Sequence, residues 1–262
     1  MLYSQRLQNI PPYLFAKLED KTAQLRKKGV DIISLGIGDP DLPPPRMLID
    51  AIHKHVEEED THFYSVSRGN AAVRQGIAQW FKGRFGVEMD PDTEVMVTIG
   101  SKESLANFSR AFVNPGDKVG VPNPGYPVYG NGAVILNEGI AQDVPLLKEN
   151  GFMPRLEDFE GCKIGFFNIP NNPTGAVGPD DFWVKMAEWI DGHPETGMVH
   201  DDAYSEMTFG DYKAPSLMQF TRNAIEFHSL SKLFNCTGYR IGFAVGRKDL
   251  IDGLVKVKSQ LD

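Results

Sequence analysis

A lysine among small hydroxyl residues, with an arginine a short way on, marks the stretch HSLSKLFNCTGYRIGF at residues 228–243. Lys232 follows an apolar run and the serines Ser229 and Ser231, so its amine is expected at the rim of a sheltered site, where burial favours the neutral form that a Schiff base needs. Arg240 with hydroxyls nearby is typical of a phosphate site. A phosphorylated carbonyl compound captured by a lysine describes pyridoxal phosphate. A surface lysine on a turn, with Arg240 solvated, is the alternative that this stretch leaves open.

Two further segments could complete such a site. Ser101 in GSKES lies between a glycine and a helical pattern, so backbone N–H groups at the helix start could bind a phosphate. A plain helix cap without ligand is the alternative. Asp201 in HDDAY ends an apolar run and could pair with a pyridinium nitrogen, which would keep the ring an electron sink. Its neighbour Asp202 should point to the opposite face of the strand and is expected to be structural.

An amide and an aromatic ring lie in two proline-rich turns. Asn172 in NNPTG could bond a ligand, although a simple tight turn explains the same residues. Tyr126 in PGYPVY offers a flat face for a ring, and packing beside the prolines is the alternative.

The elements that must position these residues alternate along the chain. Helical spacing of apolar residues occurs in 68–86, 101–113 and 180–190. Because strands and helices alternate, we expect an α/β fold with a mostly parallel sheet covered on both faces, and a ligand site beyond the carboxyl ends of the strands. The predicted strands are residues 94–100, 117–122, 163–170, 197–204, 224–231 and 239–246.

Composition bounds the classes of function. With 262 residues, 41% of them hydrophobic, the chain can bury a full core. A net charge of −8 argues against a nucleic-acid partner or an anionic membrane surface. Cys162 and Cys236 have no C-x-x-C spacing and no run reaches the length of a signal peptide core or a membrane span, so we expect a cytoplasmic protein with reduced thiols.

The spacing of the six histidines does not indicate a metal site. His53 and His55 lie two apart on a predicted helix and so do not share a face. The remaining four histidines, His62, His193, His200 and His228, form no ligand pattern among themselves, and no metal site is predicted.

Taken in order, the segments LGIGDPD, YSVSRG, GSKES, PNPGYPVY, NNPTG, DDAY and SLSKLFNCTGYRIGF resemble the class I and II aminotransferases, which have the fold-type I architecture of pyridoxal-phosphate enzymes. The resemblance is strongest to the branch of LL-diaminopimelate aminotransferases, enzymes of lysine biosynthesis, and related alanine-forming aminotransferases. It covers nearly the whole chain, and the ordered set is far more specific than any one motif. It implies transamination between an L-amino acid and a 2-oxo acid; LL-diaminopimelate with 2-oxoglutarate and alanine with glutamate both stay open.

The resemblance also implies roles for the residues around the cofactor ring. Lys232 would form the Schiff base with pyridoxal phosphate and, once released, carry the proton between the substrate's α carbon and C4′ of the cofactor. Asp201 would bond the pyridine nitrogen, and Tyr126 would stack on the ring. Asn172 and Tyr204 would hold the phenolic oxygen.

Other implied roles concern the phosphate, the substrate and a second subunit. Tyr64 would reach the cofactor phosphate of a neighbouring subunit, so the implied active form is a homodimer. Gly38 would line the substrate side, where a side chain would obstruct it. The phosphate would be bound by Ser101, the backbone around Lys102, Ser229 and Arg240.

The domain division follows from the same resemblance and from the proline cluster DPDLPPP at residues 39–45. Residues 1–45 are expected to form an N-terminal arm and part of a small domain, and residues 46–262 the cofactor-binding large domain. Members of the family continue into a C-terminal segment that builds most of the small domain and supplies an arginine for the substrate carboxylate. This chain stops at Asp262 without it, so a catalytically impaired cofactor-binding fragment is one alternative. A β-eliminating lyase of the same fold, which shares the cofactor contacts and differs in how substrate is held, is the other.

Overall fold

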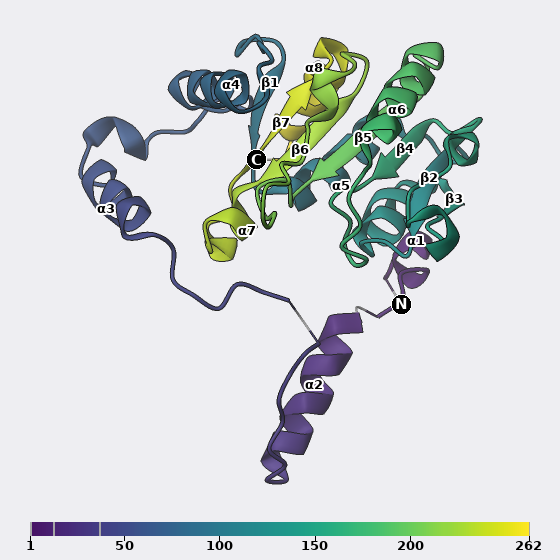
Figure 1. Cartoon of the computed structure of the whole chain (residues 1–262). Helices are drawn as coiled ribbons and strands as arrows, with labels where there is room; N and C mark the ends of the chain where they lie inside the picture. The colour runs from purple at the N-terminus through teal and green to yellow at the C-terminus, as the bar shows by residue number, and fades with distance from the viewer. Residues whose placement is uncertain (1, 13, 37, 262) are drawn as a thin grey trace.

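One seven-stranded sheet organises the protein in the computed structural model, which describes residues 2–12, 14–36 and 38–261 (Figure 1). The strand order is β1-β7-β6-β5-β4-β2-β3. The strands are β1 (Val95–Thr98), β2 (Lys118–Asn123), β3 (Ile140–Pro145), β4 (Ile164–Phe167), β5 (Gly197–Asp202), β6 (Ile225–Ser229) and β7 (Gly242–Gly246).

Strand directions confirm the expected mostly parallel sheet. Strands β2 to β6 pair in parallel, while β7 runs antiparallel to both of its neighbours, β6 and β1. Strand β1 therefore points the same way as β6. As a result, six strands end at one edge of the sheet, and β7 starts there.

Helices cover both faces, as the alternating pattern predicts (Figure 1). One face packs against α4 (Ala71–Phe85) and α6 (Asp180–Gly192), whose Phe81 and Trp183 are fully buried in its core. The other face packs against α5 (Ser101–Phe112) and α8 (Lys248–Lys258), whose apolar residues recur at helical spacing and lie in a second core. The central strands are buried on both sides, so their sequences are apolar without strict alternation.

The N-terminal segment lies outside these layers. Helix α1 (Gln5–Gln8) reaches the sheet domain through an ion pair of 3.1 Å between Arg6 and Glu138. Helix α2 (Leu14–Lys27) extends away from the sheet, and α3 (Arg46–His55) stands apart from it on a long connection (Figure 1). The proposed boundary between residues 45 and 46 stays a prediction. Within the described ranges, no helix has the length and apolar character needed to cross a lipid bilayer.

Six strands and three helices match the predicted strands and helical segments, and the helix expected around His53 and His55 is α3. Strand β3, of sequence IAQDVP, was not predicted, because polar Gln142 and Asp143 interrupt its apolar residues and most of this edge strand is at least partly exposed. Helix α8 was not predicted either. The short elements are η1 (Glu59–His62), η2 (Tyr129–Val134), η3 (Ile135–Asn137), η4 (Lys148–Asn150), η5 (Leu156–Phe159), η6 (Leu217–Gln219), α7 (Leu230–Leu233) and η7 (Thr237–Tyr239).

Candidate active site

The edge where six strands end also carries most of the predicted site residues. In an open α/β sheet this edge is where ligands bind. The residues that the topology brings there are Ser101 after β1, Tyr126 after β2, Asn172 after β4, Asp201 within β5, Ser229 at the end of β6, Lys232 in α7 and Arg240 just before β7.

Asp201 is a buried carboxylate with one oxygen engaged and one open. Its Oδ2 accepts a hydrogen bond of 2.7 Å from the hydroxyl of Tyr129, while Oδ1 is buried and finds no hydrogen-bond partner among the described residues. Burial raises the pKa of Asp201 to about 6, against the opposing effect of the Tyr129 hydrogen bond. An unpaired buried carboxylate oxygen is costly, and a ligand group that donates to it would offset this cost.

Asn172 and Tyr204 meet, as their implied shared role requires. The amide nitrogen of the Asn172 side chain donates to the Tyr204 hydroxyl at 3.2 Å. Burial, followed by the nearby charge of Asp201, raises the pKa of Tyr204. Asn168 links this pair to β5: its side chain donates to the backbone carbonyl of Asp201 at 2.6 Å and accepts from the Asn172 backbone at 2.6 Å.

Arg240 lies against the start of α5, where a phosphate was predicted. A Cβ placed on Gly100 would come within 2.6 Å of Arg240 Nη2, and Gly100 has φ +80°, so the guanidinium occupies space that only glycine leaves free. The same nitrogen donates to the carbonyl of Ile99 at 3.4 Å. Ser101 and Lys102 are the first two residues of α5. A guanidinium beside a helix N-terminus is suited to an anion.

Lys232 lies in α7, whose N-cap Ser229 accepts a hydrogen bond from the Ser231 backbone. Its side chain is one quarter exposed, and Nζ lies 3.3 Å from Oδ1 of Asp39. Asp39 directly follows Gly38, so the segment around Gly38 passes beside the lysine. A Cβ on Gly38 would meet no atom of the chain within 4 Å, and its role toward substrate stays a prediction.

The other two predicted tyrosines, Tyr126 and Tyr64, differ in their surroundings. Tyr126 is half-buried and packs edge-on against Tyr129, with ring centroids 5.9 Å apart. Tyr64 lies in the connection between η1 and α4 with a fully exposed side chain. The contact implied for Tyr64 lies in another protomer's site and stays a prediction.

Comparison with protein families decides the class of this site. Residues 30–261 match the family model "Aminotransferase class I and II". The chain belongs to the class I and II aminotransferases. The chain is similar to the LL-diaminopimelate aminotransferase of Aquifex aeolicus, with 45% identity over 268 residues, 99% of this chain and 69% of the relative.

Solved aminotransferase-like structures share the fold of this aminotransferase. BacF from Bacillus subtilis with bound substrate superposes with a TM-score of 0.93 at 32% identity, covering 100% of this chain and 67% of that one. The aspartate aminotransferase of Thermus thermophilus with maleate gives a TM-score of 0.90 at 29% identity, covering 100% and 69%. The fold-type I architecture is therefore confirmed.

Class I and II aminotransferases use pyridoxal phosphate, and the residues of this aminotransferase fit that cofactor. The open Oδ1 of Asp201 is an acceptor for a protonated ring nitrogen. The Arg240 guanidinium at the start of α5 fits the phosphate, and the Lys232 amine is the group that a carbonyl compound would bind. One edge of the sheet thus presents a suitable group for the ring nitrogen, the phosphate and the carbonyl carbon of the cofactor.

Two residues of this site were missed by the sequence reasoning. Tyr129 ends the quoted PGYPVY motif, but only its distance to Asp201 reveals that it holds that carboxylate. The ring is fully buried and stacks on Phe166. Asp39 lies in the quoted segment LGIGDPD, but it was given no role. Neither contact follows from local sequence, because each joins segments far apart in the chain.

The opposite face of β5 carries a different set of charges in this aminotransferase. Asp202 is there as predicted, and Oδ2 lies 3.5 Å from Nδ1 of His228. Ligand atoms of His200, Asp202 and Glu226 lie within 4.8 Å of one another, a grouping that the sequence pattern did not indicate. Both ring nitrogens of His200 are engaged, with Glu226 and with the Ile169 carbonyl, so the histidine offers no lone pair to a metal ion.

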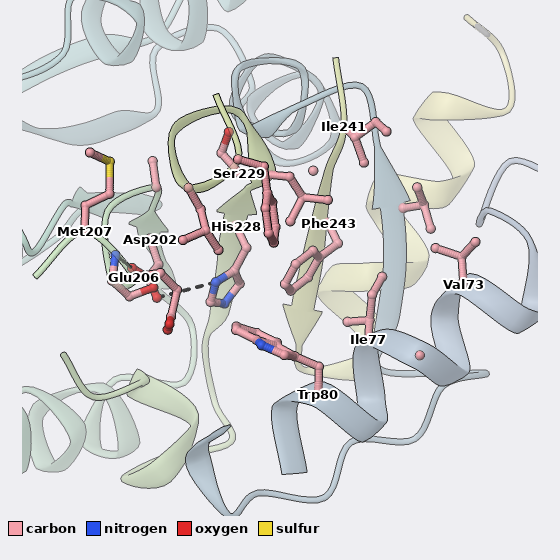
Figure 2. A pocket seen from close by; sticks show the side chains of 18 residues that line it. Val73, Ile77, Trp80, Asp202, Glu206, Met207, His228, Ser229, Ile241 and Phe243 are labelled. Carbon is pink, nitrogen blue, oxygen red and sulfur yellow. Dashed lines mark hydrogen bonds and ion pairs between the residues drawn. The ribbon is translucent and has the colours of Figure 1, made fainter. Parts of the chain in front are cut away.

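A cavity of about 360 Å³ opens on this opposite face, between α4 and the ends of β6 and β7 (Figure 2). Its lining is mostly apolar, including Ile77, Trp80 and Phe243, with Asp202 and His228 among its polar members. Of the predicted site residues, all of which lie in the described ranges, only Ser229 lines it. The cavity therefore overlaps the predicted site only at Ser229.

Proposed function

We propose that this aminotransferase moves an amino group from LL-diaminopimelate to 2-oxoglutarate with pyridoxal phosphate. The observation that carries the proposal is the convergence of an amine, an open buried carboxylate oxygen and a guanidinium at one sheet edge. The choice of donor rests on similarity to proteins named LL-diaminopimelate aminotransferase, at 43 to 46% identity.

The cofactor brings the reactive carbon, and the protein brings binding and proton transfer. Bound pyridoxal phosphate supplies a carbonyl carbon that exchanges amines and a ring that withdraws electrons from the substrate's α carbon. Lys232 would attach the cofactor through its amine, and the released amine would take the substrate's α proton and return a proton at the cofactor's C4′. Asp39, at 3.3 Å, is a carboxylate partner that stabilises the protonated amine between these transfers.

The remaining residues orient the ring and fix its charge. Asp201 accepts from the ring nitrogen through Oδ1 and keeps that nitrogen protonated, while Tyr129 holds the other oxygen. Asn172 and Tyr204, already hydrogen-bonded to each other, donate to the phenolic oxygen. Tyr126 covers one face of the ring. Arg240, Ser229 and the first turn of α5 hold the phosphate, which prevents rotation of the ring during proton transfer.

The oligomeric state and compartment are part of the same proposal. The chain acts as a homodimer in which Tyr64 reaches the phosphate of the partner's cofactor. Its fully exposed side chain supports this role, because an aromatic ring left in water is available to a second protomer. The enzyme works in the cytoplasm, which is supported by two buried free thiols, Cys162 and Cys236, as expected in a reducing compartment.

A half-reaction tests the function directly. The purified chain is loaded with pyridoxal phosphate and mixed with LL-diaminopimelate, and the visible spectrum is followed until the cofactor has become pyridoxamine phosphate. Addition of 2-oxoglutarate should restore the starting spectrum. L-Alanine and L-glutamate serve as comparison donors. Faster conversion by L-alanine would replace the proposed donor, and a spectrum unchanged by every amino acid would contradict transamination.

A further inference from the structure

Two histidine–carboxylate contacts lie side by side on the face of β5 and β6 that points away from Asp201. The register of the parallel strands sets His200 opposite Glu226 and Asp202 opposite His228. All four side chains are buried, with His200 and Glu226 fully so. Burying charges is costly unless they are paired and hydrogen-bonded, so a fold retains such a group where its geometry is used.

The hydrogen bonds of His200 define its charge. Nδ1 donates to Oε1 of Glu226 at 2.7 Å and Nε2 donates to the backbone carbonyl of Ile169 at 2.9 Å. Both partners are acceptors, so both ring nitrogens carry protons and the ring is an imidazolium. Phe167 stacks on it at 4.7 Å, and Trp183 packs edge-on. The ring is therefore fixed in orientation as well as in charge.

Several hydrogen bonds also fix the position of the Glu226 carboxylate. Besides His200, it accepts hydrogen bonds of 2.5 Å from the Ser216 hydroxyl and 2.6 Å from the Leu217 backbone. Nε2 of His228 lies 3.4 Å from Oε2 of Glu226. Burial would raise the pKa of Glu226, but the hydrogen bond from His200 and the neighbouring His228 outweigh it and hold the pKa below the usual range. The carboxylate stays ionised.

These contacts join three strand ends that carry cofactor groups. Ile169 follows β4 and precedes Asn172 by three residues, and His200 directly precedes Asp201 in β5. Glu226 lies in β6, three residues before Ser229, the N-cap of the helix that carries Lys232. On the other face, Asn168 already couples Asp201 to Asn172. One imidazolium thus ties together the segments that present Asn172, Asp201 and Lys232.

We propose that the buried His200–Glu226 pair positions the cofactor-binding groups: the His200 imidazolium holds the Ile169 carbonyl and Glu226, and so sets the mutual placement of Asn172, Asp201 and Ser229. His200 touches neither cofactor nor substrate and is a positioning residue. The proposal rests on the proposed function, since it assigns the pair a role toward the pyridoxal-phosphate site.

The first test uses the wild-type chain without cofactor. Histidine labelled with ¹⁵N reports the protonation of each ring in an NMR spectrum. We expect one of the six histidines, His200, to keep both ring protons at about pH 8, where ordinary histidines with pKa about 6.5 are neutral. A neutral His200 at pH 7 would overturn the proposal. This result does not depend on cofactor binding, so it is separate from a failure of the proposed function.

The second test separates positioning from folding. His200→Gln and Glu226→Gln each leave one partner of the pair, whereas the double variant replaces both charges by amides. We expect the double variant to regain a melting temperature near wild type, yet to bind pyridoxal phosphate about tenfold to 100-fold more weakly and to shift the pH midpoint of its visible absorption band.

Two controls complete this experiment. His193→Gln removes a half-buried histidine at the end of α6 that stacks on Trp189, and it should leave the affinity and the pH midpoint unchanged. Wild-type affinity for pyridoxal phosphate, measured in parallel, establishes that the site exists. Wild-type affinity and an unshifted midpoint in the double variant would mean that the pair stabilises the fold alone and would overturn the proposal.

Discussion

Two sets of buried groups on opposite faces of strand β5 differ in their hydrogen bonding. On one face, Oδ1 of Asp201 has no hydrogen-bond partner among the described residues. On the other, His200 uses both ring nitrogens and Glu226 accepts from three groups, although Oδ2 of Asp202 and Nε2 of His228 beside them are also buried without a partner among the described residues. An unsatisfied buried polar atom costs about 1–3 kcal/mol, so Asp201 gives up stability that a bound ligand can restore, while the His200–Glu226 pair keeps the strands aligned. The contrast between Asp201 and this pair separates a binding group from a supporting pair.

Among substitutions at the cofactor site, removal of the Lys232 amine should have the largest effect on activity. Lys232→Ala is expected to abolish covalent attachment of pyridoxal phosphate and transamination, because it removes the amine that lies beside Asp39 at this sheet edge. Lys185→Ala is the matched control, since Lys185 is an exposed lysine of α6 paired with Asp181 at 2.6 Å. Mass spectrometry after borohydride reduction and steady-state rates measure both effects. Full activity of Lys232→Ala would refute its role.

Adjacent carboxylates on opposite faces allow the sharpest comparison. Asp201→Asn should lower the half-reaction rate by about 100-fold or more, because the ring nitrogen loses the charge that keeps it protonated. Asp202→Asn, one residue away and equally buried, should change the rate far less. Stopped-flow spectra give both rates. Equal losses in the two variants would mean that burial rather than contact with the ring explains the effect.

Matched glycines can test the phosphate site. Gly100→Ala and Gly116→Ala both place a side chain at positive φ, +80° and +88°, a backbone conformation that costs a residue with a side chain about 1–3 kcal/mol of stability. Only the Cβ at Gly100 would displace Arg240. We therefore expect Gly100→Ala alone to weaken pyridoxal phosphate binding, by about tenfold to 100-fold, and to leave binding of unphosphorylated pyridoxal unchanged. Equal affinity of the two variants for pyridoxal phosphate would argue against this anion site.

The His200–Glu226 pair should make the free energy of unfolding depend on pH. Burial alone would lower the pKa of His200, but its hydrogen bond to Glu226 and the charges of Asp202 and Glu226 raise it to about 9. The folded chain thus retains a proton that the unfolded chain releases above pH 6.5, so this stabilisation is complete below pH 6.5 and is lost as the pH rises through about 9. The free energy of unfolding should fall by about 3 kcal/mol at most across this window.

Urea unfolding of the cofactor-free chain at several pH values measures this slope. The double variant His200→Gln/Glu226→Gln has no titrating imidazole at this position, so its curve should be flatter between pH 6.5 and 9. Parallel curves for the two proteins would show that the pair does not hold the extra proton.

Sequence reasoning recovered the sheet and the cofactor groups because both have local signatures. Apolar runs predicted six strands, and Lys232, Asp201 and Asn172 each follow or end one of them, so the parallel topology alone brings them together. Strand β3 was missed because polar Gln142 and Asp143 interrupt its apolar residues, as an exposed edge strand allows. The partners Tyr129 and Asp39, and the His200–Glu226 pair, depend on distances between remote segments, which spacing along the chain does not contain.

The attachment site of the cofactor tests the central claim most directly. The purified chain is incubated with pyridoxal phosphate, reduced with borohydride, digested and mapped by mass spectrometry. The account predicts a single reduced adduct on the peptide that contains Lys232. An adduct on another lysine, or no specific adduct at saturating cofactor, would contradict the assignment of this sheet edge as the active site.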